Sequence, residues 1–275
     1  MENHIVFNNQ PLHYRVQGSG PWVVLIHGFI ESIEIWNELA AVLSEKFSVL
    51  MVDLPGHGRS GLNDEDQTIP LMASGVRAVM ASLEINDCIL CGHSMGGYVS
   101  LEIAREIHDK IKGLVLFHSH AAPDDEKAKE NRNRTINVVK LNHTNFIHSF
   151  FPDLFAESNR ESLAVQIERL RNRSASTSSK AIIAALSAMR EREGSFDVLM
   201  NASFPVMFII GKDDSRMPYE KIIAQSMLTL HAEILMLANV GHMGMLEAPQ
   251  VIFPAINDFC KRNLQVKLPL QGYSD

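Results

Sequence analysis

The segment with the clearest chemical potential is GHSMGG at residues 92–97, because it presents a serine hydroxyl on a sharp turn. It follows the apolar run at residues 88–91, which predicts a strand, and it precedes a helical pattern. A serine on such a strand-to-helix turn projects out of the fold. The predicted helix starts near Met95 and points its unpaired N–H groups at the place where an oxyanion would form. Ser94 is therefore the candidate nucleophile, and other segments must supply a base, an acid and a second oxyanion donor.

Strand and helix patterns alternate along most of the chain, which predicts how such groups could be brought together. Strands are expected at residues 4–8, 12–16, 22–27, 48–52, 87–91, 111–117, 205–210 and 232–237. Helices are expected at residues 32–43, 69–83, 95–107, 219–230 and 249–263. Repeated strand–helix–strand units predict an α/β fold with a mainly parallel, doubly wound sheet of about eight strands. Functional groups should gather at the carboxyl ends of those strands.

The alternation stops between residues 121 and 200, where the chain is rich in charged and helix-forming residues and has no convincing strand. The sheet pattern continues on both sides of this segment. We therefore expect a core made of residues 1–120 and 201–275, with residues 121–200 inserted as a helical lid, or cap.

Composition excludes several classes of function. The 275 residues include 46% hydrophobic and 21% charged residues and carry a net charge of −7, which argues against broad binding to nucleic acid or anionic membranes. No apolar run approaches the roughly 18 residues that span a bilayer, and the N-terminus does not resemble a signal peptide. A cytoplasmic protein is expected.

The cysteines and histidines predict neither a disulfide framework nor a metal site. The chain has three cysteines, and Cys88 and Cys91 lie three apart in a predicted strand, so they should face opposite sides as buried structural residues. The histidine spacing lacks the acidic support of a zinc site. We expect no metal and no cofactor.

Five segments in order resemble the α/β-hydrolase fold family over nearly the whole chain. They are His27-Gly28-Phe29, residues 53–60, residues 92–97, residues 211–214 with Pro218, and Gly241-His242 with Glu247 and Pro249. The resemblance implies a triad of Ser94, Asp214 and His242, in the chain order usual for this fold. It also implies an oxyanion hole formed by the backbone N–H groups of Phe29 and Met95.

Two other carboxylates, Asp213 and Asp124, are alternatives to Asp214 as the acid of the triad. Asp213 is adjacent, but the family pattern Gly-x-x-Asp-x-x-x-Pro falls on Gly211, Asp214 and Pro218 and favours Asp214. Some relatives carry the acid after the sixth strand, where the first carboxylate of this chain is Asp124. Asp214 is expected to hold the imidazole of His242 in the right tautomer.

Further residues are expected near the substrate or in supporting loops. His118 and His120 end a predicted strand and are predicted to contact the substrate. Phe150 belongs to an aromatic series in the insertion that either packs the insertion onto the sheet or lines an apolar substrate pocket; Phe150 is predicted to be a pocket residue. Residues 53–60 are expected to form a structural loop, and His27, His57 and His93 to orient loops rather than transfer protons.

The resemblance implies a serine hydrolase that cleaves a small carboxylic ester through an acyl-enzyme, with a small-molecule substrate as its partner. Related dehalogenases and epoxide hydrolases carry aspartate at the position of Ser94, which excludes those activities. Carbon–carbon bond hydrolysis, thioester hydrolysis and a lyase reaction of menaquinone synthesis use a similar triad and stay open, as does a non-enzymatic ligand receptor. No feature of the sequence predicts the oligomeric state.

Overall fold

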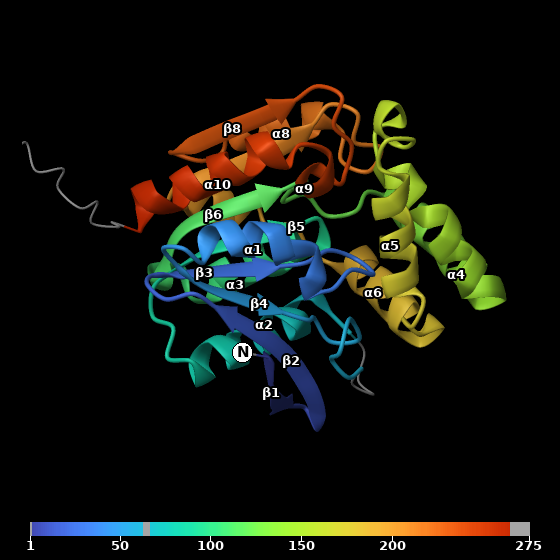
Figure 1. Cartoon of the computed structure of the whole chain (residues 1–275), viewed down its shortest axis with the longest axis horizontal. Coiled ribbons are helices and arrows are strands. Elements are labelled where there is room, and N and C mark those ends of the chain that lie inside the picture. Colours follow the sequence, from blue (N-terminus) through green and yellow to red (C-terminus); the bar gives the residue numbers. More distant parts are fainter. Residues whose placement is uncertain (1, 63–66, 265–275) are drawn as a thin grey trace, which may run out of the picture.

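The computed structural model describes residues 2–62 and 67–264, which form a mostly parallel sheet covered by helices on both faces (Figure 1). The strands are β1 (Glu2–Phe7), β2 (Gln10–Gln17), β3 (Trp22–Ile26), β4 (Ser48–Val52), β5 (Cys88–His93), β6 (Ile111–Phe117), β7 (Val206–Gly211) and β8 (Ala232–Leu237). Their order in the sheet is β1-β2-β4-β3-β5-β6-β7-β8. Only the pairings of β2 with β1 and β4 are antiparallel. The predicted α/β class and eight-stranded sheet are confirmed.

The helices divide into those that cover the sheet and those that follow β6. The first group comprises α1 (Asn37–Leu43), α2 (Ile69–Ser82), α3 (Met95–Glu106), α8 (Tyr219–Ser226), α9 (Gly244–Glu247) and α10 (Pro249–Asn263). In Figure 1, α1 and α10 lie in front of the sheet, and α2 and α3 lie behind it. None of the helices in the described ranges is long and apolar enough to cross a membrane.

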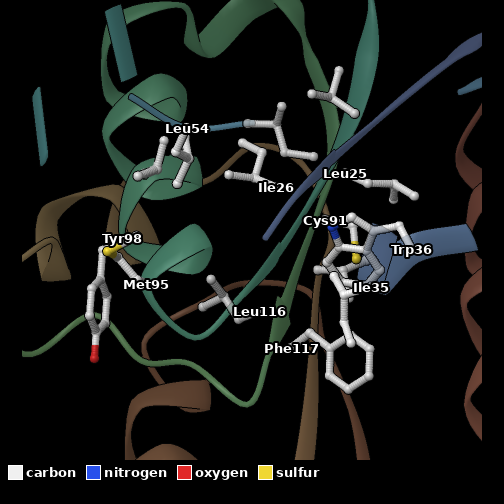
Figure 2. Close-up of a cluster of buried hydrophobic side chains, with 14 of the residues drawn as sticks. Leu25, Ile26, Ile35, Trp36, Leu54, Cys91, Met95, Tyr98, Leu116 and Phe117 are labelled. Atoms are coloured by element: carbon white, nitrogen blue, oxygen red, sulfur yellow. The ribbon is translucent and has the colours of Figure 1, made fainter. Parts of the chain in front are cut away.

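The central strands are buried on both faces, which explains why they appear in the sequence as continuous apolar runs. Successive side chains of a strand point to opposite faces. Figure 2 accordingly shows Leu25 beside Trp36 on one side of the sheet, while its neighbour Ile26 points to the side where Met95 lies. Cys88 and Cys91 are buried and unbridged, as expected of structural cysteines in β5.

The chain between β6 and β7 forms only helices, namely α4 (Glu126–Phe150), α5 (Ala164–Ser174), α6 (Ser179–Glu191), α7 (Phe196–Asn201) and the short 3₁₀ turns η3 (Pro152–Leu154) and η4 (Glu157–Asn159). Figure 1 shows α4, α5 and α6 beside the carboxyl ends of the strands. The helices between β6 and β7, in the segment where an insertion is expected, thus lie at the edge of the sheet where the candidate catalytic groups gather.

Some predicted elements differ in detail. The helix expected at residues 32–43 begins instead as a 3₁₀ turn, η1 (Ile33–Trp36), because the side chain of Ser32 accepts the N–H of Glu34 and the Asp53 carboxylate holds the N–H of Ile33. The helix expected at residues 219–230 ends at Ser226.

Candidate active site

Ser94 lies on a strained turn between β5 and α3. Its backbone has φ 52° and ψ −117°, a conformation that costs free energy and persists only where the surroundings enforce it. The Ser94 N–H donates to the carbonyl of Phe117 at 2.9 Å, which ties the turn to the end of β6. A Cβ atom on Gly96 would overlap the carbonyl of Ile26, so the close approach of α3 to β3 requires glycine there. The side chain of Ser94 is partly exposed, as a nucleophile must be.

His242 and Asp214 form a buried hydrogen-bonded pair. The distance between His242 Nδ1 and Asp214 Oδ2 is 2.7 Å. The other carboxylate oxygen, Oδ1, accepts the N–H groups of Arg216 at 2.8 Å and Met217 at 3.0 Å. Burial opposes ionisation, but the charge of His242 and hydrogen bonds from His118 and His242 hold the pKa of Asp214 far below its ordinary value. Asp213 is exposed, so the structure brings Asp214 rather than its neighbour to the imidazole.

The turn that carries His242 lies directly against the turn of Ser94. His93, which precedes Ser94, has its Nε2 atom 2.9 Å from the carbonyl oxygen of His242, and the centroids of the two rings are 4.9 Å apart. No hydrogen bond joins the Ser94 hydroxyl to His242 within the described ranges. Such bonds are commonly long in enzymes without substrate and tighten when substrate binds.

Two backbone N–H groups flank the turn as possible oxyanion donors. Met95 is the first residue of α3, so its N–H has no acceptor inside the helix. Phe29 lies in the loop after β3, and in the described part of the chain its N–H donates to no other backbone or side-chain atom. The preceding residue is fixed, because Gly28 N–H donates to Glu31 Oε2 at 2.6 Å.

His118 lies behind Asp214 rather than at the surface of a pocket, which corrects its expected position. It is fully buried, and its Nδ1 atom is 3.4 Å from Asp214 Oδ2. Burial lowers the pKa of His118 to about 4, so the ring is neutral near pH 7. His118 directly follows β6 and has a positive φ of 46°.

His120 and Phe150 lie in two different places, His120 beside a cavity at α3 and Phe150 against the loop after β3. His120 lines a cavity of about 270 Å³ together with Tyr98, which is one helical turn beyond Ser94 on α3. Phe150, at the end of α4, packs edge-on against Phe29, with the ring centroids 5.6 Å apart. The insertion therefore contacts the residue proposed as oxyanion donor.

Two carboxylates that organise these loops were not assigned a role from the sequence. Glu31 accepts the N–H of Gly28 and contacts His93 Nδ1 at 3.1 Å. Glu247 accepts the N–H groups of Gly241 at 3.0 Å and Met243 at 3.2 Å, on both sides of His242. The sequence position of Glu247 could have indicated this role, because a carboxylate soon after a Gly-His turn can accept the N–H groups of that turn.

The segment at residues 53–60 is tied to neighbouring parts of the chain by hydrogen bonds. Asp53 is buried and accepts the N–H groups of Ile33 at 2.8 Å and Arg59 at 2.9 Å, and it pairs with His13 Nδ1 at 2.8 Å. His27 Nε2 accepts the N–H of Leu54 at 3.0 Å, so this histidine also orients a loop.

The sequence model of the Alpha/beta hydrolase family matches residues 23–255. A thermophilic esterase from Thermogutta terrifontis has a similar structure, with a TM-score of 0.89 and 29% identity, over 95% of this chain and 98% of that one.

Two curated relatives cover different shares of the chain. The (E)-2-((N-methylformamido)methylene)succinate hydrolase of Acinetobacter baylyi is 24% identical over 250 residues, which is 90% of this chain and 94% of that protein. An uncharacterized protein of Mycobacterium tuberculosis is 33% identical over 112 residues, and the match spans only 33% of that protein's length.

Proposed function

The chain belongs to the α/β hydrolase family, and on that premise we propose that it is a serine hydrolase that cleaves small carboxylic esters through an acyl-enzyme intermediate. The observation that carries the proposal is the buried Asp214–His242 pair, at 2.7 Å, held by His93 against the strained turn of Ser94. A serine hydroxyl is a weak nucleophile until a base takes its proton. An oriented neutral imidazole beside it is such a base.

In the proposed first half-reaction, Ser94 Oγ attacks the ester carbonyl carbon and gives its proton to His242 Nε2. The carbonyl oxygen becomes an oxyanion that accepts the N–H groups of Phe29 and Met95, each typically worth roughly 100- to 1,000-fold in rate. The C–O bond to the alcohol part then breaks, and His242 returns the proton to the leaving alkoxide. Ser94 is left acylated, and the alcohol departs.

In the second half-reaction, His242 takes a proton from water, and the resulting hydroxide attacks the acyl carbon. The second tetrahedral intermediate collapses, Ser94 recovers its proton from His242, and the carboxylic acid leaves. Asp214 does not change its protonation, because its low pKa keeps it ionised while it stabilises the imidazolium.

The insertion is proposed to act as a cap that selects the acyl or alcohol part of the substrate. Its main chain reaches the catalytic turn, since the carbonyl of Leu154 accepts the N–H of His242 at 2.6 Å. Its aromatic end reaches the oxyanion loop through the contact of Phe150 with Phe29. The esterase from Thermogutta terrifontis, similar over 95% of this chain, supports carboxylic esters as the substrate class.

A panel of p-nitrophenyl esters from acetate to decanoate, run beside an acyl thioester and a vinylogous diketone, tests this proposal. We expect the highest kcat/KM on short-chain esters and no turnover above background for Ser94→Ala. Turnover of the thioester or diketone alone would contradict the ester assignment. Tight ligand binding without turnover of any substrate would contradict an enzyme altogether.

A further inference from the structure

A buried ion pair, Glu31–His93, joins three of the loops that carry the proposed catalytic groups, namely those of Phe29, Ser94 and His242. Glu31 belongs to the loop after β3, and His93 ends β5 immediately before Ser94. Their side chains are 2% and 0% exposed, and the distance between Glu31 Oε2 and His93 Nδ1 is 3.1 Å. Neither residue touches substrate in the proposed mechanism, so the mechanism leaves the pair unexplained.

The hydrogen bonds of the pair are all satisfied by an ion pair. His93 Nε2 lies 2.9 Å from the carbonyl oxygen of His242, and a carbonyl can only accept, so Nε2 carries a proton. His93 Nδ1 faces a carboxylate oxygen that also accepts the N–H of Gly28. An imidazolium that donates from both nitrogens, facing an ionised carboxylate, satisfies every one of these contacts.

Electrostatics supports the same assignment. Burial alone would lower the pKa of His93, but the charge of Glu31 and the hydrogen bond to it outweigh burial and raise that pKa. Burial would raise the pKa of Glu31, but the charge of His93 and the hydrogen bond with it lower that pKa. Phe117 and Trp36 pack edge-on to His93, so the pair is held in apolar surroundings where attraction between charges is strong.

We propose that the Glu31–His93 ion pair is a positioning device that holds the oxyanion loop, the nucleophile turn and the His242 turn in mutual register. Through Gly28 N–H, Glu31 fixes the peptide next to the proposed oxyanion donor Phe29. Through the carbonyl of His242, His93 fixes the backbone of the proposed base. Because His93 directly precedes Ser94, its contacts with Glu31 and with the His242 carbonyl lie one residue from the proposed nucleophile. The pair thus acts on the proposed transition state, in which all three loops must be aligned at once.

This inference rests on the proposed function and is tested with Glu31→Gln. Glutamine has the size of glutamate and keeps an oxygen for Gly28 N–H, but it removes the charge. We expect kcat for p-nitrophenyl acetate to fall about 100-fold, the loss that a misplacement of about 1 Å can cause, while KM changes less than threefold. A phenylboronic acid forms a tetrahedral adduct on serine. The affinity of Glu31→Gln for this compound should fall by about the same factor as kcat, although KM stays nearly unchanged.

A second pair in the same chain provides the matched control. His13 and Asp53 are also a buried histidine–carboxylate pair, at 2.8 Å, but they lie outside the three loops. His13→Gln should lower Tm and leave kcat within threefold of wild type. The double variant Glu31→Gln/His93→Gln should lose no more kcat than the worse single variant, because each change breaks the same unit.

Three results would overturn the inference. One is a Glu31→Gln enzyme whose kcat stays within threefold of wild type while its Tm falls as in the His13→Gln control. Another is a Glu31→Gln enzyme whose KM rises by as large a factor as its kcat falls. The third needs no variant: long-range ¹H–¹⁵N spectra of the wild-type protein at pH 7 should show both ring nitrogens of His93 protonated, and a neutral ring contradicts the pair. If a fluorophosphonate probe fails to label Ser94 in the wild-type enzyme, that result instead refutes the proposed function.

Discussion

His242 Nδ1 lies 2.7 Å from Asp214 Oδ2, and the N–H groups of Arg216 and Met217 hold the other carboxylate oxygen in place. An ionised carboxylate accepts only, so the proton of the neutral imidazole must sit on Nδ1. That tautomer leaves Nε2 as the basic nitrogen, which is the one the proposed mechanism uses. The fixed orientation of Asp214 therefore selects the protonation state that makes His242 a base.

Asp214→Asn should lower kcat about 10⁴-fold, because an amide can donate to Nδ1 and favour the wrong tautomer. Steady-state kinetics on a short-chain ester measures the effect. Asp213→Asn is the matched control, since this neighbour is exposed and should retain wild-type kcat. Equal losses in both variants, or none in Asp214→Asn, would remove Asp214 from the mechanism.

Glu247→Ala should destabilise the His242 turn. The Glu247 carboxylate accepts N–H groups from Gly241 and Met243 and also from Ala156 of the insertion at 2.9 Å. Removing it leaves partly buried donors unsatisfied, at a cost of about 2 kcal/mol in the free energy of unfolding. Glu247→Gln keeps one oxygen and should fall between wild type and Glu247→Ala in urea unfolding. If both variants unfold at the wild-type midpoint, the bonds of Glu247 contribute nothing to stability.

Gly96→Ala should lower stability by about 3 kcal/mol, because the new Cβ would overlap the backbone of β3 and force α3 away from the sheet. Gly75→Ala is the control within helix α2, where the Cβ would meet only side chains, with Leu12 Cδ2 nearest at 3.3 Å. That change should be neutral or slightly stabilising, since alanine favours helix over glycine. The Tm of Gly96→Ala should therefore fall well below that of wild type, whereas the Tm of Gly75→Ala should equal or slightly exceed it.

The Glu31–His93 pair predicts a specific pH dependence of stability. The raised pKa of His93 stabilises the fold fully below its ordinary value of 6.5, and this contribution is lost as the pH rises through the folded-state pKa. The lowered pKa of Glu31 contributes fully above 4.5 and is lost as the pH falls through the folded-state pKa. The Tm difference between wild type and Glu31→Gln should therefore be greatest between pH 4.5 and 6.5.

That pH profile is measured by calorimetry on both proteins. Other titratable groups face the pair, namely His27 and His57 beside Glu31 and, beside His93, Asp214 and the rings of His118 and His242. They are present in both proteins, so taking the difference isolates the pair. A difference that is constant from pH 4 to 9 would contradict an ion pair.

The sheet and the order of the candidate site residues could be predicted from the sequence because their signals are local. Central strands such as β5 are short apolar runs, and the turn at Ser94 needs glycine at fixed positions. Parallel strands then bring distant carboxyl ends to one edge, so the proximity of His242 to the turn of Ser94 follows from topology.

The supporting contacts could not be predicted because they depend on side-chain direction rather than spacing. Glu31 and His93 are 62 residues apart, and only the packed structure turns them toward each other. His118 is expected at the pocket because it ends a predicted strand, yet its ring is fully buried and its Nδ1 atom lies 3.4 Å from Asp214 Oδ2. In the insertion, α4 contains a non-helical residue, Asn142, for which the helical pattern gives no signal.

The central claim, that Ser94 is an activated nucleophile, is tested most directly by labelling with a fluorophosphonate probe and mapping the adduct by mass spectrometry. We expect stoichiometric phosphonylation of Ser94 in the wild-type protein. We also expect labelling to slow strongly in His242→Ala and to disappear in Ser94→Ala, together with esterase activity. A wild-type protein that is folded but unlabelled, or labelled at a residue other than Ser94, would contradict the account.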